Sequence, residues 1–218
     1  MTNEKVSAAP SVRRLPGYLN IIRAFQEEGG EYISSAAIAK ELDMDAIQVR
    51  KDLAITGVLG RPQRGYPVEE LLTAIERFLG WDTARDAVLV GVGNLGSALL
   101  GYREFNLHGL TIIAAFDTDH RKIGTVIHGV KIMNGRTMDI QLSRLGIKMA
   151  ILTVPAGEAQ ETANVLVQAE IEGIWNFTGV KLAVPVHVTV QNEDLSSGFA
   201  MLCIKMHNKR GIRGINGG

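Results

Sequence analysis

The sequence predicts an α/β chain in which a small helical domain precedes a larger domain built on a parallel sheet. Three observations support this fold class. Apolar residues recur at helical spacing between residues 16 and 79. From residue 86 onwards, short apolar runs alternate with helical segments, as strands and helices do in a parallel sheet. Residues 80–85 separate the two patterns and form the natural domain boundary.

Composition limits the class of protein. A chain of 218 residues with 46% hydrophobic content can form one large domain or two small ones. No stretch approaches the roughly 18 apolar residues of a membrane span, and residues 1–10 lack a signal-peptide core. The single cysteine, Cys203, excludes an intramolecular disulfide. These features favour a cytoplasmic protein. The net charge of zero gives no general argument for nucleic-acid binding.

The first strand of the second domain leads into a glycine-rich turn. The run from Asp86 to Gly96 (DAVLVGVGNLG) predicts a buried strand, a turn and then a helix over residues 97–102. In the dinucleotide-binding pattern, Gly91 makes the tight turn, Gly93 lets backbone approach a pyrophosphate, and Gly96 permits close helix–strand packing. The phosphates are expected at the N-terminus of the helix, where free N–H groups favour negative charge. The alternative is a glycine-rich turn that binds nothing.

A second apolar run, residues 110–116, predicts the neighbouring parallel strand. It ends at Asp117, which lies 21 residues after Gly96. That spacing suits an acid that hydrogen-bonds the adenosine ribose, and it favours NAD over NADP because a carboxylate repels the 2′-phosphate. The alternative role for Asp117 is that of a helix cap or turn residue.

The remainder continues the alternation of strands and helices. Strands are expected over residues 149–154, 173–177 and 184–190, the last broken at Pro185, and helices over residues 156–172 and 195–207. The sequence therefore predicts a Rossmann dinucleotide-binding domain over residues 84–192. The segments 1–12 and 209–218 are expected to be disordered.

The N-terminal domain, residues 13–80, has the outline of a winged helix. A first helix over residues 16–28 precedes two short helices, 36–42 and 46–55, joined by a three-residue turn. Residues 60–67 are rich in turn formers and stand where a β-hairpin wing is expected, and residues 68–79 predict a further helix.

Local charge favours DNA as the partner of this domain. Residues 46–66 contain four basic residues and one acid. Gln48, Arg50 and Lys51 on the second short helix suit base edges and phosphates, and Arg61 and Arg64 suit a minor groove. The alternative is an ordinary helical domain with a solvated charged face. Residues 1–80 hold 10 basic and 11 acidic residues, so a specific site is favoured over general affinity.

With a winged-helix candidate joined to an NAD-type domain, the chain resembles the Rex family of redox-sensing transcriptional repressors over roughly residues 13–207. The segments that carry the resemblance are RLPGYL (14–19), QVRKDL (48–53), RGY (64–66), VGVGNLGSAL (90–99), FDTD (116–119), KIG (122–124), TVP (153–155), GIWNF (173–177) and NEDL (192–195). The combination is specific, although no single segment is.

The resemblance implies a homodimer that binds a palindromic double-stranded operator when NADH is scarce and leaves it when NADH binds. It also implies that the helix over residues 195–207 swaps between subunits; its apolar residues fit an ordinary core helix equally well. The motifs and the resemblance together give the expected site residues. For NADH and NAD they are Gly91, Gly93, Asn94, Leu95, Gly96, Tyr102, Asp117, Thr118, Lys122, Thr153, Val154, Pro155, Asn176, Phe177 and Asp194. For DNA they are Ser34, Gln48, Arg50, Lys51, Arg61, Arg64, Gly65 and Tyr66.

The sequence departs from the family pattern in three places. Residues 54–57 read Ala-Ile-Thr-Gly where the family usually has Ser-Tyr-Phe-Gly, and residues 62–66 read Pro-Gln-Arg-Gly-Tyr in place of Arg-Gly-Val-Gly-Tyr. A different preferred operator is therefore expected. Tyr102 and Asp194 match two members of the family's nicotinamide-reporting trio, but Asn20 stands where its arginine is expected. Arg23, one turn on, is the candidate substitute.

Two rival functions remain at this point. A small NAD-dependent dehydrogenase would need a substrate domain, for which residues 84–218 leave little room, and the five histidines form no dehydrogenase-like arrangement. A regulator that senses coenzyme A or NADP is the second rival. No catalytic residue is expected, and Cys203 with scattered histidines lacks metal-ligand spacing. Cys203 is expected to be packed within the last helix.

Overall fold

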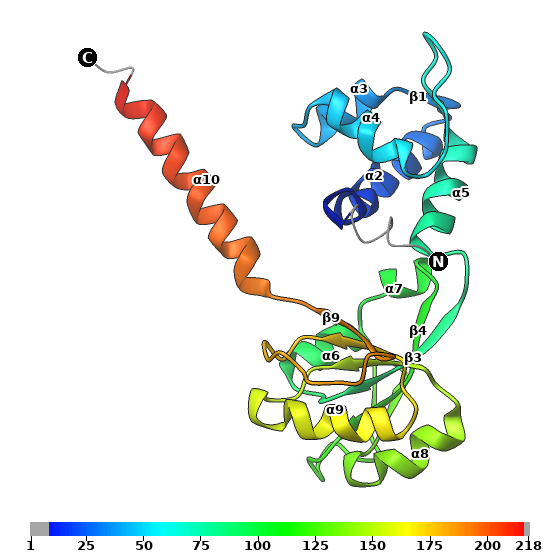
Figure 1. Cartoon of the computed structure of the whole chain (residues 1–218), viewed down its shortest axis with the longest axis vertical. Helices are drawn as coiled ribbons and strands as arrows, with labels where there is room; N and C mark the ends of the chain where they lie inside the picture. Colours follow the sequence, from blue (N-terminus) through cyan, green and yellow to red (C-terminus); the bar gives the residue numbers. More distant parts are fainter. Residues whose placement is uncertain (1–8, 216–218) are drawn as a thin grey trace. The chain divides into compact units, whose positions relative to one another are not determined.

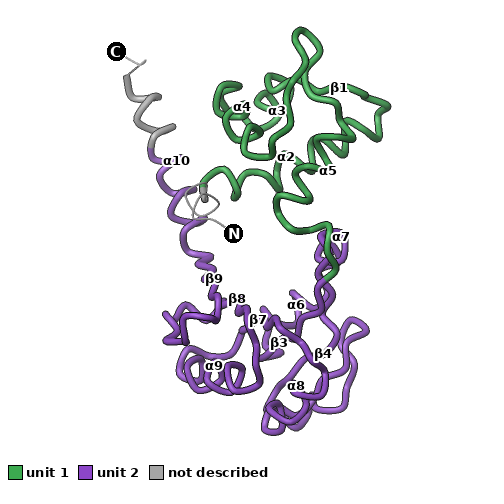
Figure 2. The backbone as a smooth tube through the Cα atoms, turned by 45° about the vertical axis from the view of Figure 1, so that its right-hand side comes forward, with its two compact units in different colours: residues 1–84 green, residues 85–218 purple. Residues whose placement is uncertain are grey.

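The structure, a computed structural model, describes the backbone of residues 9–215 and the side chains of residues 10–207. The chain divides into two compact units between Ala84 and Arg85 (Figure 2). Each unit has its own hydrophobic core.

Unit 1 is a bundle of helices with a small antiparallel sheet. Its elements are α2 (Ala9–Glu27), β1 (Tyr32–Ile33), α3 (Ser35–Glu41), α4 (Ala46–Ala54), β2 (Tyr66–Pro67) and α5 (Val68–Leu79). The oxygens of Ser34 and Asp45 accept the N–H groups of Ala37 and Ile47, so each short helix of the predicted helix-turn-helix begins at a side-chain cap. The residues between α4 and β2 form the expected wing, closed by the bridge between Arg61 and Gly65.

The first helix begins earlier than the sequence predicts. α2 starts at Ala9, so residues 9–12 are helical and not disordered; residues 1–8 lie outside the described part. Pro16 lies inside the helix and removes one backbone donor, which ordinarily ends or kinks a helix. Side chains also anchor the turns before Pro16, because Ser11 and Arg14 both donate to Asp52 of α4.

Asp52 is the centre of a buried polar network between α2 and α4. Its side chain is fully buried, and Arg14 donates to both oxygens, at 2.6 and 2.8 Å. Tyr18 donates at 2.5 Å, and Ser11 and Gln48 each donate at 2.8 Å. Burial by itself raises the pKa of the Asp52 carboxyl, but these donors together hold that pKa well below its usual range. Burial and the bond to Asp52 raise the pKa of Tyr18 to about 12.

Unit 2 is a doubly wound α/β domain. Its elements are β3 (Arg85–Val90), α6 (Asn94–Leu100), α7 (Glu104–Leu107), β4 (Leu110–Asp117), β5 (Val126–Ile127), β6 (Val130–Asn134), η1 (Gly135–Thr137), α8 (Met138–Leu145), β7 (Met149–Leu152), η2 (Ala156–Glu158), α9 (Ala159–Gln168), β8 (Gly173–Asn176), β9 (Thr189–Asn192) and α10 (Leu195–Ile215). The strand order is β5-β6-β4-β3-β7-β8-β9, with β5 antiparallel to β6 and the other pairs parallel.

The sheet is covered by different helices on its two faces. Met138 and Leu142 of α8 and Ala163 of α9 belong to the core on one face. Leu100 of α6 packs on the other face with Leu89 and Ile151. Figure 1 shows α8 and α9 running along one side of the strands. The fold class that the sequence predicts is therefore confirmed.

Two stretches of unit 2 differ from the sequence prediction. The sequence pattern predicts no helix or strand over residues 118–148, yet this stretch contains β5, β6 and α8. The strand expected over residues 184–190 is replaced by β9 at Thr189–Asn192. Pro185 lacks an N–H for a ladder, and its carbonyl instead accepts the Val188 N–H in a turn before the strand begins.

The last helix, α10, carries exposed apolar side chains. Leu195, Phe199 and Leu202 are 71%, 69% and 54% exposed, and all side chains described in α10 are exposed. The backbone is helical to Ile215, so residues 209–215 differ from the expected disorder; residues 216–218 lie outside the described part. None of the described helices, α10 included, is long and apolar enough to cross a membrane.

Replacing the buried carboxylate, Asp52→Asn, is expected to destabilise unit 1 by about 2–4 kcal/mol at neutral pH, because Arg14 loses its partner and an amide cannot accept every donor. Folding lowers the pKa of Asp52. The contribution of Asp52 to the free energy of unfolding is therefore complete above the unfolded-state pKa of about 4, and it fades as the pH falls below that value. Urea unfolding of both proteins, followed by far-ultraviolet circular dichroism, should therefore show a difference that shrinks in acid.

Glu76→Gln is the matched control. It removes the carboxylate that pairs with Arg23 at 2.7 Å, in a pair whose side chains are 28% and 34% exposed. A partly solvated pair of this kind contributes less than about 1 kcal/mol. An equal loss of unfolding free energy in the two variants would contradict the conclusion that Asp52 is the centre of the network that stabilises unit 1.

Candidate functional site

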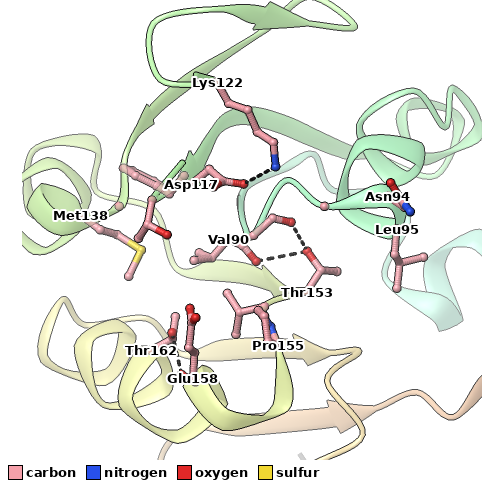
Figure 3. A pocket seen from close by; sticks show the side chains of 16 residues that line it. Val90, Asn94, Leu95, Asp117, Lys122, Met138, Thr153, Pro155, Glu158 and Thr162 are labelled. Carbon is pink, nitrogen blue, oxygen red and sulfur yellow. Dashed lines mark hydrogen bonds and ion pairs between the residues drawn. The ribbon is translucent and has the colours of Figure 1, made fainter. Parts of the chain in front are cut away.

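A cavity of about 500 Å³ opens at the carboxyl ends of β3, β4 and β7 (Figure 3). β4 and β7 flank β3, and the chain crosses from one side of β3 to the other between them. This is the switch point of a doubly wound sheet, where open α/β folds bind their ligands. The location therefore makes this cavity the candidate ligand site of unit 2.

The glycine turn forms the cavity wall through backbone contacts. Gly91 has a φ of +96°, and a Cβ there would lie 2.8 Å from the Thr153 carbonyl carbon. A Cβ on Gly96 would lie 2.1 Å from the Gly91 oxygen. Thr153 stabilises the close approach of the glycine turn to the end of β7, since its hydroxyl donates to the Gly91 carbonyl at 2.6 Å. These positions tolerate only glycine if the strand ends are to stay this close.

Gly93 plays a different part from its two neighbours. It caps α6, and a Cβ built on it meets no atom within 4 Å. The chain itself therefore does not require glycine at this position. Gly93 lines the cavity, so the space that a side chain would take is space for a ligand.

Asp117 ends β4 with a fixed carboxylate. The N–H groups of Val92 and Asp119 each donate to it at 2.8 Å. Lys122 bridges the site by donating to the Val92 carbonyl at 2.7 Å and to Asp117 at 3.2 Å. The carboxylate is 12% exposed and lines the cavity, so its remaining lone pairs can accept hydroxyl groups from a ligand.

The lining carries little positive charge. Asp117 and Glu158 are acidic and Lys122 is basic, and Figure 3 shows Glu158 and Thr162 across the cavity from Asp117 and Lys122. A pyrophosphate would therefore depend on the first N–H groups of α6, which have no partner within the helix. A further phosphate beside Asp117 would be repelled.

Ten of the residues expected to bind the cofactor line this cavity. They are Gly91, Gly93, Asn94, Leu95, Asp117, Thr118, Lys122, Thr153, Val154 and Pro155. Gly96 lies behind the wall, where it permits the close approach already described. The residues bring together a glycine turn, a helix N-terminus and an acid, which is the set that fits a dinucleotide.

Four expected cofactor residues lie elsewhere. Asn176 is 1% exposed and does not line the cavity; its amide nitrogen donates to Val180 and Asn192, and its amide oxygen accepts from Thr178.

Phe177 stacks near Trp175, with ring centroids 5.0 Å apart, and does not line the cavity. Tyr102 is half exposed and donates to Glu104, and Asp194 caps α10 by accepting the Ser196 N–H. Neither side chain reaches the cavity within this chain, so the sequence match to a reporting pair is not reproduced inside one subunit.

Six lining residues were missed by the sequence analysis. They are Val90, Phe116, Gly135, Met138, Glu158 and Thr162. Gly135 and Met138 belong to the stretch that received no element. Glu158 and Thr162 follow the end of the strand predicted over residues 149–154. Because ligands bind at the carboxyl ends of parallel strands, this position could have identified them as lining residues.

In unit 1 the wing and α4 enclose a second hollow of about 600 Å³. Of the residues expected to contact DNA, Ser34, Arg50, Arg61, Arg64, Gly65 and Tyr66 border it. Arg50, Arg61 and Arg64 are exposed, and so is Lys51, which lies on α4 outside the hollow. The arrangement presents several cations on one surface, as a phosphate backbone requires.

Two of the residues expected to contact DNA also have a structural role within unit 1. Tyr66 is 7% exposed and belongs to the core of unit 1, because β2 places its ring inward, where it also covers Gly60. The amide nitrogen of Gln48 donates to the buried Asp52, so Gln48 serves the network beneath α4. Gly65 has a φ of +91°, and a Cβ there would lie 2.4 Å from the Ile33 carbonyl oxygen. The backbone of the wing therefore requires glycine at this position.

Two further expectations concern the rest of the chain. Cys203 is exposed and not packed, like every other side chain that the structure describes in α10. Within the described residues, no three His, Cys, Asp or Glu side chains gather closely enough to hold a metal ion.

Comparison with known proteins gives matches over both units. Residues 82–180 match the family model of a CoA binding domain, and residues 5–54 match that of a putative DNA-binding protein N-terminus. The redox-sensing transcriptional repressor Rex of Treponema denticola is 51% identical, over 96% of this chain and 100% of its own.

Solved structures agree with the sequence relatives. The Rex-family repressor RSP bound to β-NAD⁺ and operator DNA is 32% identical, with a TM-score of 0.82 over 96% of each chain. RSP bound to β-NADH is 30% identical, with a TM-score of 0.83 over 95% of this chain and 98% of its own. The high identity over almost the full length, with the glycine turn, its acid and the helix-turn-helix all in place, shows that the chain belongs to the Rex family of redox-sensing transcriptional repressors.

Proposed function

We infer that this chain is a DNA-binding transcriptional repressor, and not an enzyme, that responds to the balance of NADH and NAD⁺. The observation that carries this inference is the joining of a dinucleotide cavity in unit 2 to a cationic helix-turn-helix surface in unit 1. The relative RSP has been solved with NADH and, separately, with NAD⁺ and operator DNA. A repressor of this kind acts in the cytoplasm, where bacterial DNA lies.

Different residues of the cavity would bind different parts of NADH or NAD⁺. Asp117 would accept the adenosine ribose hydroxyls, and the N-terminus of α6 would receive the pyrophosphate beside Gly93. The nicotinamide would lie near Val154 and Pro155. A neutral reduced ring leaves water for such an apolar surface more readily than a cationic oxidised ring does. The chain can therefore distinguish the two states by desolvation.

The DNA surface would read a palindromic operator through two copies of unit 1. Arg50 and Lys51 are exposed on α4, and Arg61 and Arg64 extend from the wing. Ser34 stands at the N-terminus of α3, which borders the same hollow. A two-fold symmetric dimer presents two such surfaces at a fixed spacing, as a palindrome requires.

A second copy of the chain would cover α10. Its exposed Leu195, Phe199 and Leu202 find no partner among the described residues of unit 2. Burial of such side chains in a dimer would stabilise the assembly. We therefore propose a homodimer in which α10 is exchanged between subunits.

The switch in this chain cannot rely on an arginine at position 20. Arg23, the candidate substitute, already donates to Glu76 of α5 at 2.7 Å. We propose that Tyr102 and Asp194 act with groups of the partner subunit, while Asn20 contributes a neutral hydrogen bond in place of an ion pair.

NADH is expected to release the operator, and NAD⁺ is not. A ligand moves the DNA-bound fraction from nearly all to nearly none only if it prefers the DNA-free form by about 10⁴-fold. Fluorescence anisotropy of a labelled operator duplex, titrated with each ligand at fixed salt, measures this. Release by coenzyme A or NADPH, with no response to NADH, would favour a regulator of another nucleotide.

Gly93→Ala is expected to weaken NADH binding by about 1–3 kcal/mol, because its methyl group enters the ligand's space. The fold should be unaffected, since no protein atom lies within 4 Å of the new Cβ. Calorimetric titration measures binding, and thermal unfolding checks the fold. Gly96→Ala is the contrasting variant, because its Cβ strikes the Gly91 carbonyl and should lower stability as well.

Asp117→Asn is expected to narrow the preference for NADH over NADPH. The amide keeps the shape and can still accept the Val92 N–H, at the cost of the bond from the Asp119 N–H, but it no longer repels a 2′-phosphate. Loss of a charged hydrogen bond to the ribose should cost about 1.5–3 kcal/mol in NADH affinity. Competition of NADPH against bound NADH measures the ratio, and an unchanged ratio would remove Asp117 from the ribose site.

A further inference from the structure

Tyr32 lies beneath both arginines of the wing. The Arg61 guanidinium carbon stands 5.3 Å from the centre of the Tyr32 ring, and that of Arg64 stands 5.5 Å from it. Arg61 also donates to the Tyr32 hydroxyl at 2.7 Å. Tyr32 is half-buried in β1 and pairs with Pro67 of β2 through the backbone.

The backbone of the wing is already fixed without Tyr32. Arg61 and Gly65 close the loop, with the Arg61 N–H donating to the Gly65 carbonyl at 2.7 Å and the Gly65 N–H returning to the Arg61 carbonyl at 3.0 Å. Gln63 and Gly65 hold positive φ angles of 62° and 91°. What remains free is the long side chain of each arginine, which can adopt many rotamers.

Among the described residues, Tyr32 restrains both side chains, through its ring for each arginine and through its hydroxyl for Arg61. Both arginines are exposed, and neither pairs with a carboxylate in the part of the chain that the structure describes. Two guanidinium groups on one loop repel each other, and the negative face of an aromatic ring offsets that repulsion. The contact with the ring face consumes no hydrogen bond, and the bond from Arg61 to the hydroxyl uses one of its five N–H donors, so most donors of both arginines stay available.

We propose that Tyr32 is a positioning residue that holds Arg61 and Arg64 in one orientation, ready for the phosphates and minor groove of the operator. Restraining two arginines before binding lowers the side-chain entropy that they lose on the DNA. The ring stands at the strand that borders the wing, and the fold places it there independently of DNA. This inference rests on the proposed operator binding.

The test measures operator affinity of the full-length chain by fluorescence anisotropy at fixed salt, with a duplex selected from a random library by the wild-type chain. Tyr32→Ala should weaken binding by about tenfold, since two cation–ring contacts are lost. Tyr32→Phe keeps the ring and should stay within about threefold of wild type. The matched control is Arg77→Ala, which removes an exposed arginine of unit 1 outside the wing.

A double-mutant cycle separates positioning from general support of the fold. In the Arg61→Ala, Arg64→Ala background, Tyr32→Ala should change affinity by less than about twofold, because nothing is left to position. An equal loss in both backgrounds, or wild-type affinity in Tyr32→Ala, overturns the inference. A wild-type chain that selects no duplex would instead contradict the proposed function, so the two failures are distinguishable. Thermal unfolding followed by far-ultraviolet circular dichroism verifies that unit 1 of each variant is folded.

Discussion

The helix-turn-helix unit depends on the need to satisfy one buried carboxylate. Asp52 has no access to water, so every lone pair that water would have served must find a donor within the chain. Four side chains meet that need, three from α2 and one from α4. Because Asp52 and the exposed Arg50 and Lys51 share α4, the network that fixes α2 also fixes the helix that would face DNA.

The two candidate sites are built by different means. In unit 2, the cavity wall is made from backbone, and Gly91, Gly96 and Thr153 decide how closely the strand ends approach. In unit 1, a backbone loop carries side chains whose orientation depends on neighbouring rings and networks. Backbone sites are precise because peptide geometry is rigid, whereas arginine sites remain adaptable. That division suits a chain that holds one small ligand and one long, deformable polymer.

The fold was predictable because its signals are local. The caps Ser34 and Asp45 accept N–H groups two or three residues away, and the glycine turn is a contiguous motif whose acid follows at a set spacing. The misses involve distant partners. The early start of α2 depends on Asp52, about 40 residues away, and the amide of Asn176 donates to Asn192, its partner on the neighbouring strand β9. Tyr66 shows the same limit, since a tyrosine after a basic loop looks exposed until β2 turns it inward.

In the proposed dimer, the exposed apolar side chains of α10 would tie the lifetime of the chain to its abundance. A subunit that covers Phe199 and Leu202 only by pairing has a folded stability that rises with its own concentration. At a low concentration of the chain, single subunits would expose this helix to chaperones and proteases and would be degraded. Newly made chains would escape when two meet soon after synthesis. The amount of repressor would then have a threshold below which subunits are cleared before they can assemble.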